Sequence, residues 1–320
     1  MHRLFLINRQ SKHVAQRGSQ LERSFEKSNI TAPIIDVGDF SVLPQIVKEA
    51  RDNKTSHVFI ESGDGTVHGV MSAFLKAQHE FSSFPNFTLI SGGMTNQIAK
   101  NIGISKHISK RLERVLAGHG RSLPMPLLEI KTGDDKINHG FLLSTGVVPH
   151  ATQHYETQMR KGTMGANISV FLTIMRTLLL KGEARDKIFK PHKITLEIEQ
   201  TAPEGKNSSG EHLTLNEDHL LTLTTTLPTI MMGLNPFWGR GNAPLKATYL
   251  PADMRRLIWH IFNIWLGRYS KTLTRDGAQS FTAHRLSFTY DRSVVIDGEP
   301  LTCPDGFMQV TPTMPVNFIS

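Results

Sequence analysis

Short apolar runs alternate with longer amphipathic stretches through the first part of the chain. The apolar runs predict strands at residues 3–8, 32–37, 57–62 and 86–91. The stretches that follow them predict helices at residues 13–28, 41–53 and 66–78, and a fourth helix that reaches residue 100. Because this alternation is typical of a parallel sheet covered by helices, we predict an α/β domain over residues 1–123.

The pattern changes to a period of two after residue 124. Residues 193–200 alternate apolar and polar side chains, residues 219–227 are rich in threonine, and two further β-prone runs follow near the C-terminus. We therefore predict a second, mainly antiparallel β-sandwich domain over residues 124–304, interrupted by a helix at 167–182. The remaining segment, residues 305–320, is expected to return to the domain interface.

Chain length bears on the number of domains, and net charge bears on the class of binding partner. A chain of 320 residues exceeds the usual size of one domain, which favours the division into two. The formal net charge of +8 favours anionic partners such as phosphorylated metabolites, anionic lipid or nucleic acid. The sequence has no zinc-finger spacing, aromatic RNA-binding motif or long Lys/Arg run, so no nucleic-acid partner is expected.

Cysteine content and apolar segments indicate the compartment. The one cysteine, Cys303, leaves no intrachain disulfide and fits a reducing environment. The apolar run at residues 4–7 is too short for a signal peptide, and the longest apolar segment, 168–180, is too short for a bilayer span and contains Arg176. We expect a cytoplasmic protein without a transmembrane helix, which contacts the membrane only at its periphery.

The sequence Gly63-Asp64-Gly65-Thr66 lies between a predicted strand and a predicted helix. Glycines there permit close approach of the backbone, and Thr66 can cap the helix, so the turn suits a phosphate. Asp64 would be repelled by a phosphate, unless it binds Mg²⁺ or accepts a proton from a hydroxyl group. The common alternative for such a triplet is a plain turn with an Asx cap.

A second glycine turn follows the next predicted strand. Gly92 and Gly93 precede Thr95 and Asn96 at a predicted helix start. Two such turns at one edge of a parallel sheet can hold a nucleotide between them, although an N-capped helix without a ligand has the same pattern.

Four motifs in this order resemble the diacylglycerol kinase catalytic-domain family, which includes sphingosine kinases and bacterial soluble lipid kinases. They are "INRQSK" (7–12), "SGDGTVHGVM" (62–71), "SGGMTNQIAKNIGI" (91–104) and "VVIDGEP" (294–300). The resemblance implies a Rossmann-like α/β domain, of the kind shared with NAD kinases, and a β-sandwich domain, with ATP and Mg²⁺ as cofactors and a lipid hydroxyl as the phosphoryl acceptor.

The resemblance also implies roles for single residues. The nucleotide would be bound by the following set: Asn8, Ser11, Lys12, Gly63, Gly65, Thr66, Gly93, Thr95 and Asn96. Asp64 would bind the metal or act as a base, while Asp297 and Glu299 would lie close to the acceptor hydroxyl as catalytic carboxylates. "DGE" by itself is more often a hairpin turn.

Some positions depart from the family pattern. Arg9 and Lys12 replace the proline and glycine of the first loop, and Ser62 replaces the first glycine of the second motif. Gln97 stands where most relatives have an aspartate that helps to organise Mg²⁺. This change motivates an alternative, a nucleotide- or lipid-binding protein without turnover; an NAD kinase-like enzyme is another.

Two apolar segments bear on the acceptor. Residues 225–250 include Met231, Met232, Phe237 and Trp238, which could line a lipid channel or belong to the core. Residues 257–267 are apolar and bracketed by arginine and lysine, so they could lie on an anionic membrane surface or form a buried helix. A homo-oligomer is compatible with either arrangement.

Overall fold

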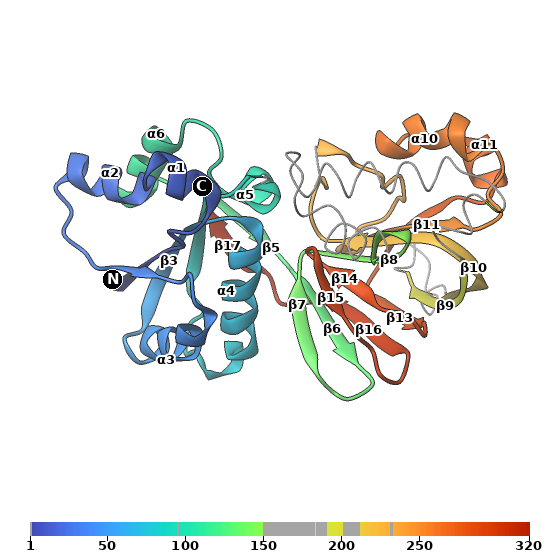
Figure 1. The fold of residues 1–320 in the computed structure, drawn as a ribbon, viewed down its shortest axis with the longest axis horizontal. Coiled ribbons are helices and arrows are strands. Elements are labelled where there is room, and N and C mark those ends of the chain that lie inside the picture. Colours follow the sequence, from blue (N-terminus) through green and yellow to red (C-terminus); the bar gives the residue numbers. More distant parts are fainter. Residues whose placement is uncertain (1, 95, 150–182, 184–190, 201–211, 231–232) are drawn as a thin grey trace. The chain divides into compact units, whose positions relative to one another are not determined.

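The computed structural model describes residues 2–94, 96–149, 183, 191–200, 212–230 and 233–320 (Figure 1). The chain divides into two compact units, the first made of Met1–Leu127 and Met314–Ser320, the second of Leu128–Thr313. Within the described residues, no helix is both long and apolar enough to cross a bilayer.

The first unit is built on a six-stranded sheet in the order β2-β1-β3-β4-β17-β5. Its strands are β1 (His2–Ile7), β2 (Ile34–Asp36), β3 (Thr55–Ser62), β4 (Asn86–Ser91), β5 (Ser122–Met125) and β17 (Val316–Ile319). All neighbouring pairs are parallel except β17 with β5. The predicted α/β class is confirmed, and the continuous apolar runs of the central strands are buried as expected for such a sheet.

Helices connect these strands. They are α1 (Lys12–Arg17), α2 (Gln20–Ser28), α3 (Leu43–Asp52), α4 (Asp64–Lys76), α5 (Gln97–Ile102) and α6 (Ile108–Leu116), with short 3₁₀ turns at Phe40–Val42 and Gln78–Glu80. The single helix predicted over residues 13–28 is wrong, because the chain breaks into α1 and α2. Gly18 has a φ of 73°, and the Ser19 side chain caps α2 by accepting from the Glu22 N–H.

The second unit contains one hydrogen-bonded sheet of 11 strands. They are β6 (Leu128–Thr132), β7 (Ile137–Gly140), β8 (Leu142–Gly146), β9 (His192–Glu199), β10 (His212–Thr225), β11 (Leu245–Pro251), β12 (Gln279–Ala283), β13 (Arg285–Thr289), β14 (Val294–Ile296), β15 (Glu299–Leu301) and β16 (Phe307–Pro312). Every described pair is antiparallel, as predicted.

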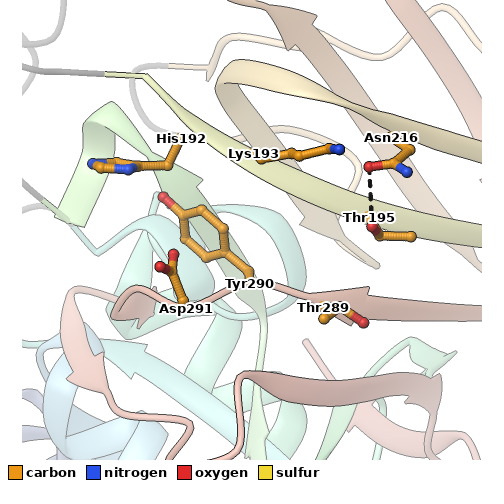
Figure 2. Close-up of a pocket in the computed structure, with 7 residues that line it drawn as sticks. All are labelled: His192, Lys193, Thr195, Asn216, Thr289, Tyr290 and Asp291. Atoms are coloured by element: carbon orange, nitrogen blue, oxygen red, sulfur yellow. Dashed lines mark hydrogen bonds between the residues drawn. The ribbon is translucent and has the colours of Figure 1, made fainter.

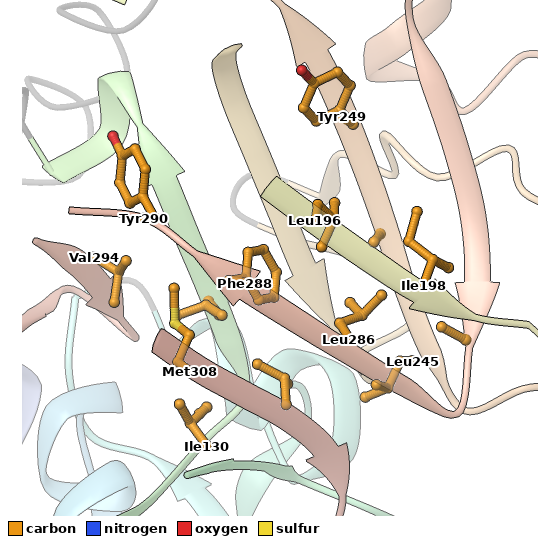
Figure 3. Packing of buried hydrophobic residues seen from close by; sticks show 14 of the residues in the cluster. Ile130, Leu196, Ile198, Leu245, Tyr249, Leu286, Phe288, Tyr290, Val294 and Met308 are labelled. Carbon is orange, nitrogen blue, oxygen red and sulfur yellow. The ribbon is translucent and has the colours of Figure 1, made fainter. Parts of the chain in front are cut away.

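The alternating pattern of β9 places its apolar side chains in the core of this unit. Ile194, Leu196 and Ile198 are fully buried, and Leu196 and Ile198 lie beside Phe288 and Leu286 of β13 (Figure 3). Two helices, α10 (Leu257–Trp265) and α11 (Lys271–Arg275), also belong to the second unit. The helix predicted at 167–182 lies outside the described residues.

The C-terminal segment 305–320 is divided between the two sheets. β16 joins the antiparallel sheet, whereas β17 lies between β4 and β5 in the first sheet. A hydroxyl group anchors β17, since Thr88 of β4 donates its single proton to the Ile319 carbonyl at 2.8 Å. The His57 Nε2, 2.9 Å from the same hydroxyl oxygen, must therefore be the donor in that pair.

Candidate nucleotide-binding site

The order of the strands locates the first candidate site. The chain leaves β1 for β2 on one side of it and then continues to β3 on the other side, so the connections diverge between β1 and β3. In open α/β sheets, ligands bind beyond the carboxyl ends of the strands at such a switch point. The predicted residues Asn8 and Ser11 follow β1, and Gly63 and Asp64 follow β3.

Hydrogen bonds join the loops after β1 and β3. The Ser11 hydroxyl lies 3.1 Å from the Ser62 hydroxyl and accepts from the Gly63 N–H at 3.3 Å. The Asn8 amide donates to the Thr66 hydroxyl at 2.8 Å. The structure therefore brings four predicted nucleotide-binding residues together: Asn8, Ser11, Gly63 and Thr66.

The two glycine turns contact each other through their backbones. A Cβ atom on Gly93 would lie only 2.5 Å from the Gly63 Cα, and the Gly92 N–H donates to the Ser62 carbonyl at 2.8 Å. A Cβ on Gly65, in contrast, would meet no atom within 4 Å. Gly63 and Gly93 are thus required by the contact between the turns, and Gly65 is the glycine with open space beside it.

Asn96 fixes the second turn. Its amide oxygen accepts from the Gly93 N–H at 2.8 Å, while its amide nitrogen donates to the Gly93 carbonyl at 2.7 Å. Asn96 is buried and has a φ of 50°, in the left-handed region that asparagine tolerates better than most residues. Thr95, the other predicted contact of this turn, lies outside the described residues.

Asp64 connects the two turns. Its carboxylate accepts from the backbone N–H groups of Gln97 at 2.9 Å and Ile98 at 3.0 Å, which are the first residues of α5. It therefore caps the neighbouring helix, an arrangement that no local motif reveals. A carboxylate has about four acceptor sites, so it can accept from both N–H groups at once.

Cations surround the loop after β1. Burial first, then the positive charges of Arg17, Lys12 and Lys100, lower the pKa of His13. The backbone N–H of His13 donates to the Gly92 carbonyl at 2.9 Å, and the Lys12 ammonium lies 2.9 Å from the Met94 sulfur. Sequence reasoning missed His13, Arg17 and Lys100, although "SKHVAQR" places two of them beside the predicted loop.

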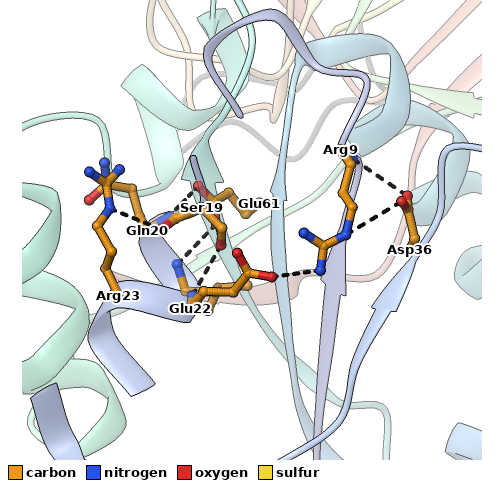
Figure 4. Close-up of polar contacts among 8 residues, drawn as sticks. Arg9, Ser19, Gln20, Glu22, Arg23, Asp36 and Glu61 are labelled. Carbon is orange, nitrogen blue, oxygen red and sulfur yellow. Dashed lines mark hydrogen bonds and ion pairs between the residues drawn. The ribbon is translucent and has the colours of Figure 1, made fainter. Parts of the chain in front are cut away.

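A buried carboxylate, that of Glu61, lies near the end of β3. Glu61 accepts from the Ser19 hydroxyl at 2.6 Å and from the N–H groups of Gln20 at 2.8 Å and Leu21 at 3.0 Å (Figure 4). These three hydrogen bonds fix the start of α2, which indicates a structural role for Glu61. Arg9, which departs from the family pattern, pairs on the surface with Glu22.

In the second unit, Asp297 and Gly298 form a two-residue hairpin loop between β14 and β15. Both have positive φ, 51° and 99°, as a type I′ turn requires. The Asp297 carboxylate accepts from the backbone N–H groups of Phe141 at 2.9 Å and Leu142 at 2.8 Å. This carboxylate consequently holds the hairpin against the start of β8.

Glu299 follows at the beginning of β15 and is exposed. Among the residues that the structure describes, no hydrogen-bond donor or cation pairs with its carboxylate. It therefore differs from Asp297, whose carboxylate is bound by backbone groups.

A separate pocket of about 490 Å³ lies on the second unit (Figure 2). It is lined by His192, Lys193, Thr195, Asn216, Thr289, Tyr290 and Asp291. Burial raises the pKa of Tyr290 to about 12, so its phenol is neutral at physiological pH. None of the predicted site residues lines this pocket.

Only some of the apolar candidates from residues 225–250 lie within the described residues. Phe237 and Trp238 are buried, and Trp238 packs in a hydrophobic cluster, which supports the interpretation as core. Met231 and Met232 lie outside the described residues. The described part of the chain contains no group of three or more His, Cys, Asp or Glu side chains able to hold a metal ion.

Comparisons with known proteins agree with the motifs. Residues 2–126 match the family model "Diacylglycerol kinase catalytic domain", which confirms the resemblance. Three similar solved structures come from Bacillus anthracis str. Sterne; two are described as a "putative diacylglycerol kinase" and the third as a diacylglycerol kinase. One is 12% identical with a TM-score of 0.62 over 98% of this chain and 93% of its own. The second is 13% identical with a TM-score of 0.63 over 98% and 94%. The third is 11% identical with a TM-score of 0.60 over 100% and 97%.

No curated protein sequence matches the chain. At these identities the solved structures show a common fold.

Proposed function

Because residues 2–126 match the diacylglycerol kinase catalytic domain, we propose that the protein is an ATP-dependent lipid kinase. It transfers the γ-phosphoryl group to a lipid hydroxyl, on diacylglycerol or a related lipid. The observation that supports this most strongly is the meeting of the glycine turns after β3 and β4 beside a cationic group at the switch point of the sheet. Phosphoryl transfer depends mainly on positioning and charge neutralisation, and these parts can supply both.

The first unit would bind the triphosphate. Lys12, Arg17 and Lys100 provide positive charge, and Gly65 leaves room for a phosphate oxygen to approach the backbone. Protonation of His13 becomes more favourable when a phosphate is bound, because an anion compensates for the cations that lower its pKa. Asn8 and Thr66 would border the nucleotide, with Ser11 beside them.

Asp64 fits a role as a ligand of Mg²⁺. Mg²⁺ is usually held by one or two carboxylates together with water and substrate phosphates, so a cage of protein side chains is not needed. The two backbone N–H groups hold the carboxylate in place, which favours a water-mediated contact with the ion. Mg²⁺ would supply neutralisation of the phosphate charge.

Glu299 is the better candidate for the catalytic base. A base must be able to reach the acceptor hydroxyl and take its proton, and the exposed carboxylate of Glu299 has no partner among the described residues. Asp297 accepts from Phe141 and Leu142 instead, so it is a positioning residue that holds the hairpin carrying Glu299.

The test is transfer of labelled γ-phosphate from ATP with Mg²⁺ to diacylglycerol, monoacylglycerol, ceramide and sphingosine in micelles. We expect one lipid to be labelled, and Asp64→Ala and Glu299→Gln each to reduce the rate by at least about a hundredfold. Glu197→Gln is the matched control, because Glu197 is an exposed carboxylate of the same unit on β9. An unchanged rate in Glu299→Gln would refute the assignment of the base.

Two other functions are distinguished when NAD is added to the same assay as a further acceptor. Label appearing in NAD, but in no lipid, would identify an NAD kinase-like enzyme. ATP binding without any transfer would identify a binding protein, an alternative supported by Gln97 in place of the family aspartate. In that case Gln97→Asp should increase transfer if the missing carboxylate is the cause.

A further inference from the structure

Helix α10 is apolar on two opposite faces. On one face Leu257 and Ile264 are buried, and they pack in a cluster with Leu273 of α11 and Trp238. α10 and α11 lie next to each other in the second unit (Figure 1). This packing accounts for only one side of the helix.

The other face of α10 carries large apolar side chains that are open to solvent. Ile258, Phe262 and Leu266 follow each other at intervals of four residues and so form one stripe, with Trp259 beside it. Trp259 is 81% exposed, Phe262 61% and Ile258 48%, and Tyr269, just after the helix, is 56% exposed. Isolated exposed apolar residues are normal, but a contiguous group marks a binding surface.

The charge around this group is mainly positive. Residues 254–275 contain five basic residues and no aspartate or glutamate. The basic residues are Arg255, Arg256, Arg268, Lys271 and Arg275. All five are exposed, while Asp253, immediately before this stretch, is an exposed carboxylate of opposite sign.

Side-chain contacts with Asp276 fix the start of α10. The buried Asp276 accepts from Arg256 Nε at 2.7 Å and Nη2 at 2.9 Å, and it lies 2.7 Å from His260 Nε2. Arg256 and then His260 hold the pKa of Asp276 well below its usual range. The charge of Asp276 is thus compensated by its own neighbours. The other basic residues of this stretch keep their positive charge for a partner.

We propose that this face of the protein docks on an anionic lipid bilayer. The α10 surface is defined as Ile258, Trp259, Phe262, Leu266 and Tyr269 together with the exposed basic residues around them. A nine-residue helix is about 14 Å long, too short to cross a bilayer, so it lies in the plane of the interface with its aromatic side chains inserted. Aromatic side chains favour that depth, and arginine and lysine bind the anionic headgroups.

Charge argues against a second copy of the chain as the occupant. A symmetric dimer through the α10 surface would bring two sets of like charges together, which is unfavourable. An anionic bilayer satisfies both the apolar and the cationic parts. The inference rests on this surface and not on the proposed kinase activity, so either can fail without the other.

The experiment measures binding of the full chain to vesicles in the absence of ATP, by co-sedimentation. Vesicles of phosphatidylcholine with about one third phosphatidylglycerol are compared with vesicles of phosphatidylcholine alone. We expect binding to the anionic vesicles that weakens by about tenfold or more in Trp259→Ala/Phe262→Ala, and that weakens also in Arg268→Gln/Lys271→Gln. Phe307→Ala is the matched control, because Phe307 is a partly exposed aromatic residue of the same unit outside the α10 surface.

A second measurement, tryptophan fluorescence, uses a variant that keeps an aromatic side chain at position 259. Trp259→Phe should keep binding but lose most of the blue shift of tryptophan fluorescence that vesicles cause in the wild-type protein. Equal binding by the wild type and the double alanine variant, no binding to anionic vesicles, or lipid-free self-association that Trp259→Ala abolishes would each overturn the proposal.

Discussion

Gly65 and Gly93 should respond in opposite ways to the same added methyl group. A Cβ on Gly93 would lie 2.5 Å from the Gly63 Cα, about 1 Å closer than carbon atoms normally approach. The atom it meets is backbone and cannot rotate away, so Gly93→Ala should lower the free energy of unfolding by about 3 kcal/mol, the upper end for overpacking. The two turns would be forced apart, and ATP affinity should fall as well.

Gly65→Ala should instead stabilise the fold and weaken ATP binding. No atom lies within 4 Å of the new Cβ, and alanine in place of glycine in a helix adds about 0.5–1 kcal/mol to the free energy of unfolding. The methyl group would occupy the space into which we place a phosphate oxygen, so the Kd for ATP should rise by about tenfold, or about 1.4 kcal/mol.

Urea denaturation and calorimetric titration with ATP measure the two quantities on the same samples. An unchanged ATP affinity in Gly65→Ala would show that no phosphate approaches this turn. A Gly93→Ala protein as stable as the wild type would refute the backbone contact between the turns.

Three further predictions concern polar groups that are buried or half-buried. Asp297→Ala should lower the free energy of unfolding by about 2–3 kcal/mol, measured by urea denaturation, because the N–H groups of Phe141 and Leu142 lose their acceptor. Glu61→Gln should lower it by about 1–3 kcal/mol in the same assay, since the start of α2 loses a charged acceptor. Burial, and then Arg3, lower the pKa of His57 to about 4, so between about pH 7.5 and 5 the unfolded chain gains a proton that the folded chain excludes, and stability should fall by about 2 kcal/mol. His57→Gln should lack that part of the pH dependence, and an identical slope in both proteins would contradict the buried, neutral state of the imidazole.

Local patterns predicted the class of both sheets because each has a simple repeat. Parallel strands read as continuous apolar runs, and β9 alternates with a period of two, so burial follows directly from the sequence. The break between α1 and α2 was also encoded, since Gly18 and Ser19 are a stop and a start signal, but the amphipathic pattern over residues 13–28 outweighed them.

Long-range contacts could not be predicted in the same way. The motif around Asp64 indicates a turn or a metal ligand, and nothing near it in the sequence indicates that it caps α5. The basic group near His13 arises because Lys100 comes from α5, far from His13 in the sequence. For Asp297, in contrast, the hairpin expected from "DGE" is the one observed.

The position of β17 has a consequence for how the protein is made. The first sheet is completed by a strand that leaves the ribosome only after the whole antiparallel sheet has been synthesised. Until then, β4 and β5 lack the partner that lies between them, and the nascent N-terminal unit has an open β-strand edge. Folding of the N-terminal unit during translation would therefore wait for β17, and deletion of Val316–Ile319 should leave an N-terminal unit prone to aggregation.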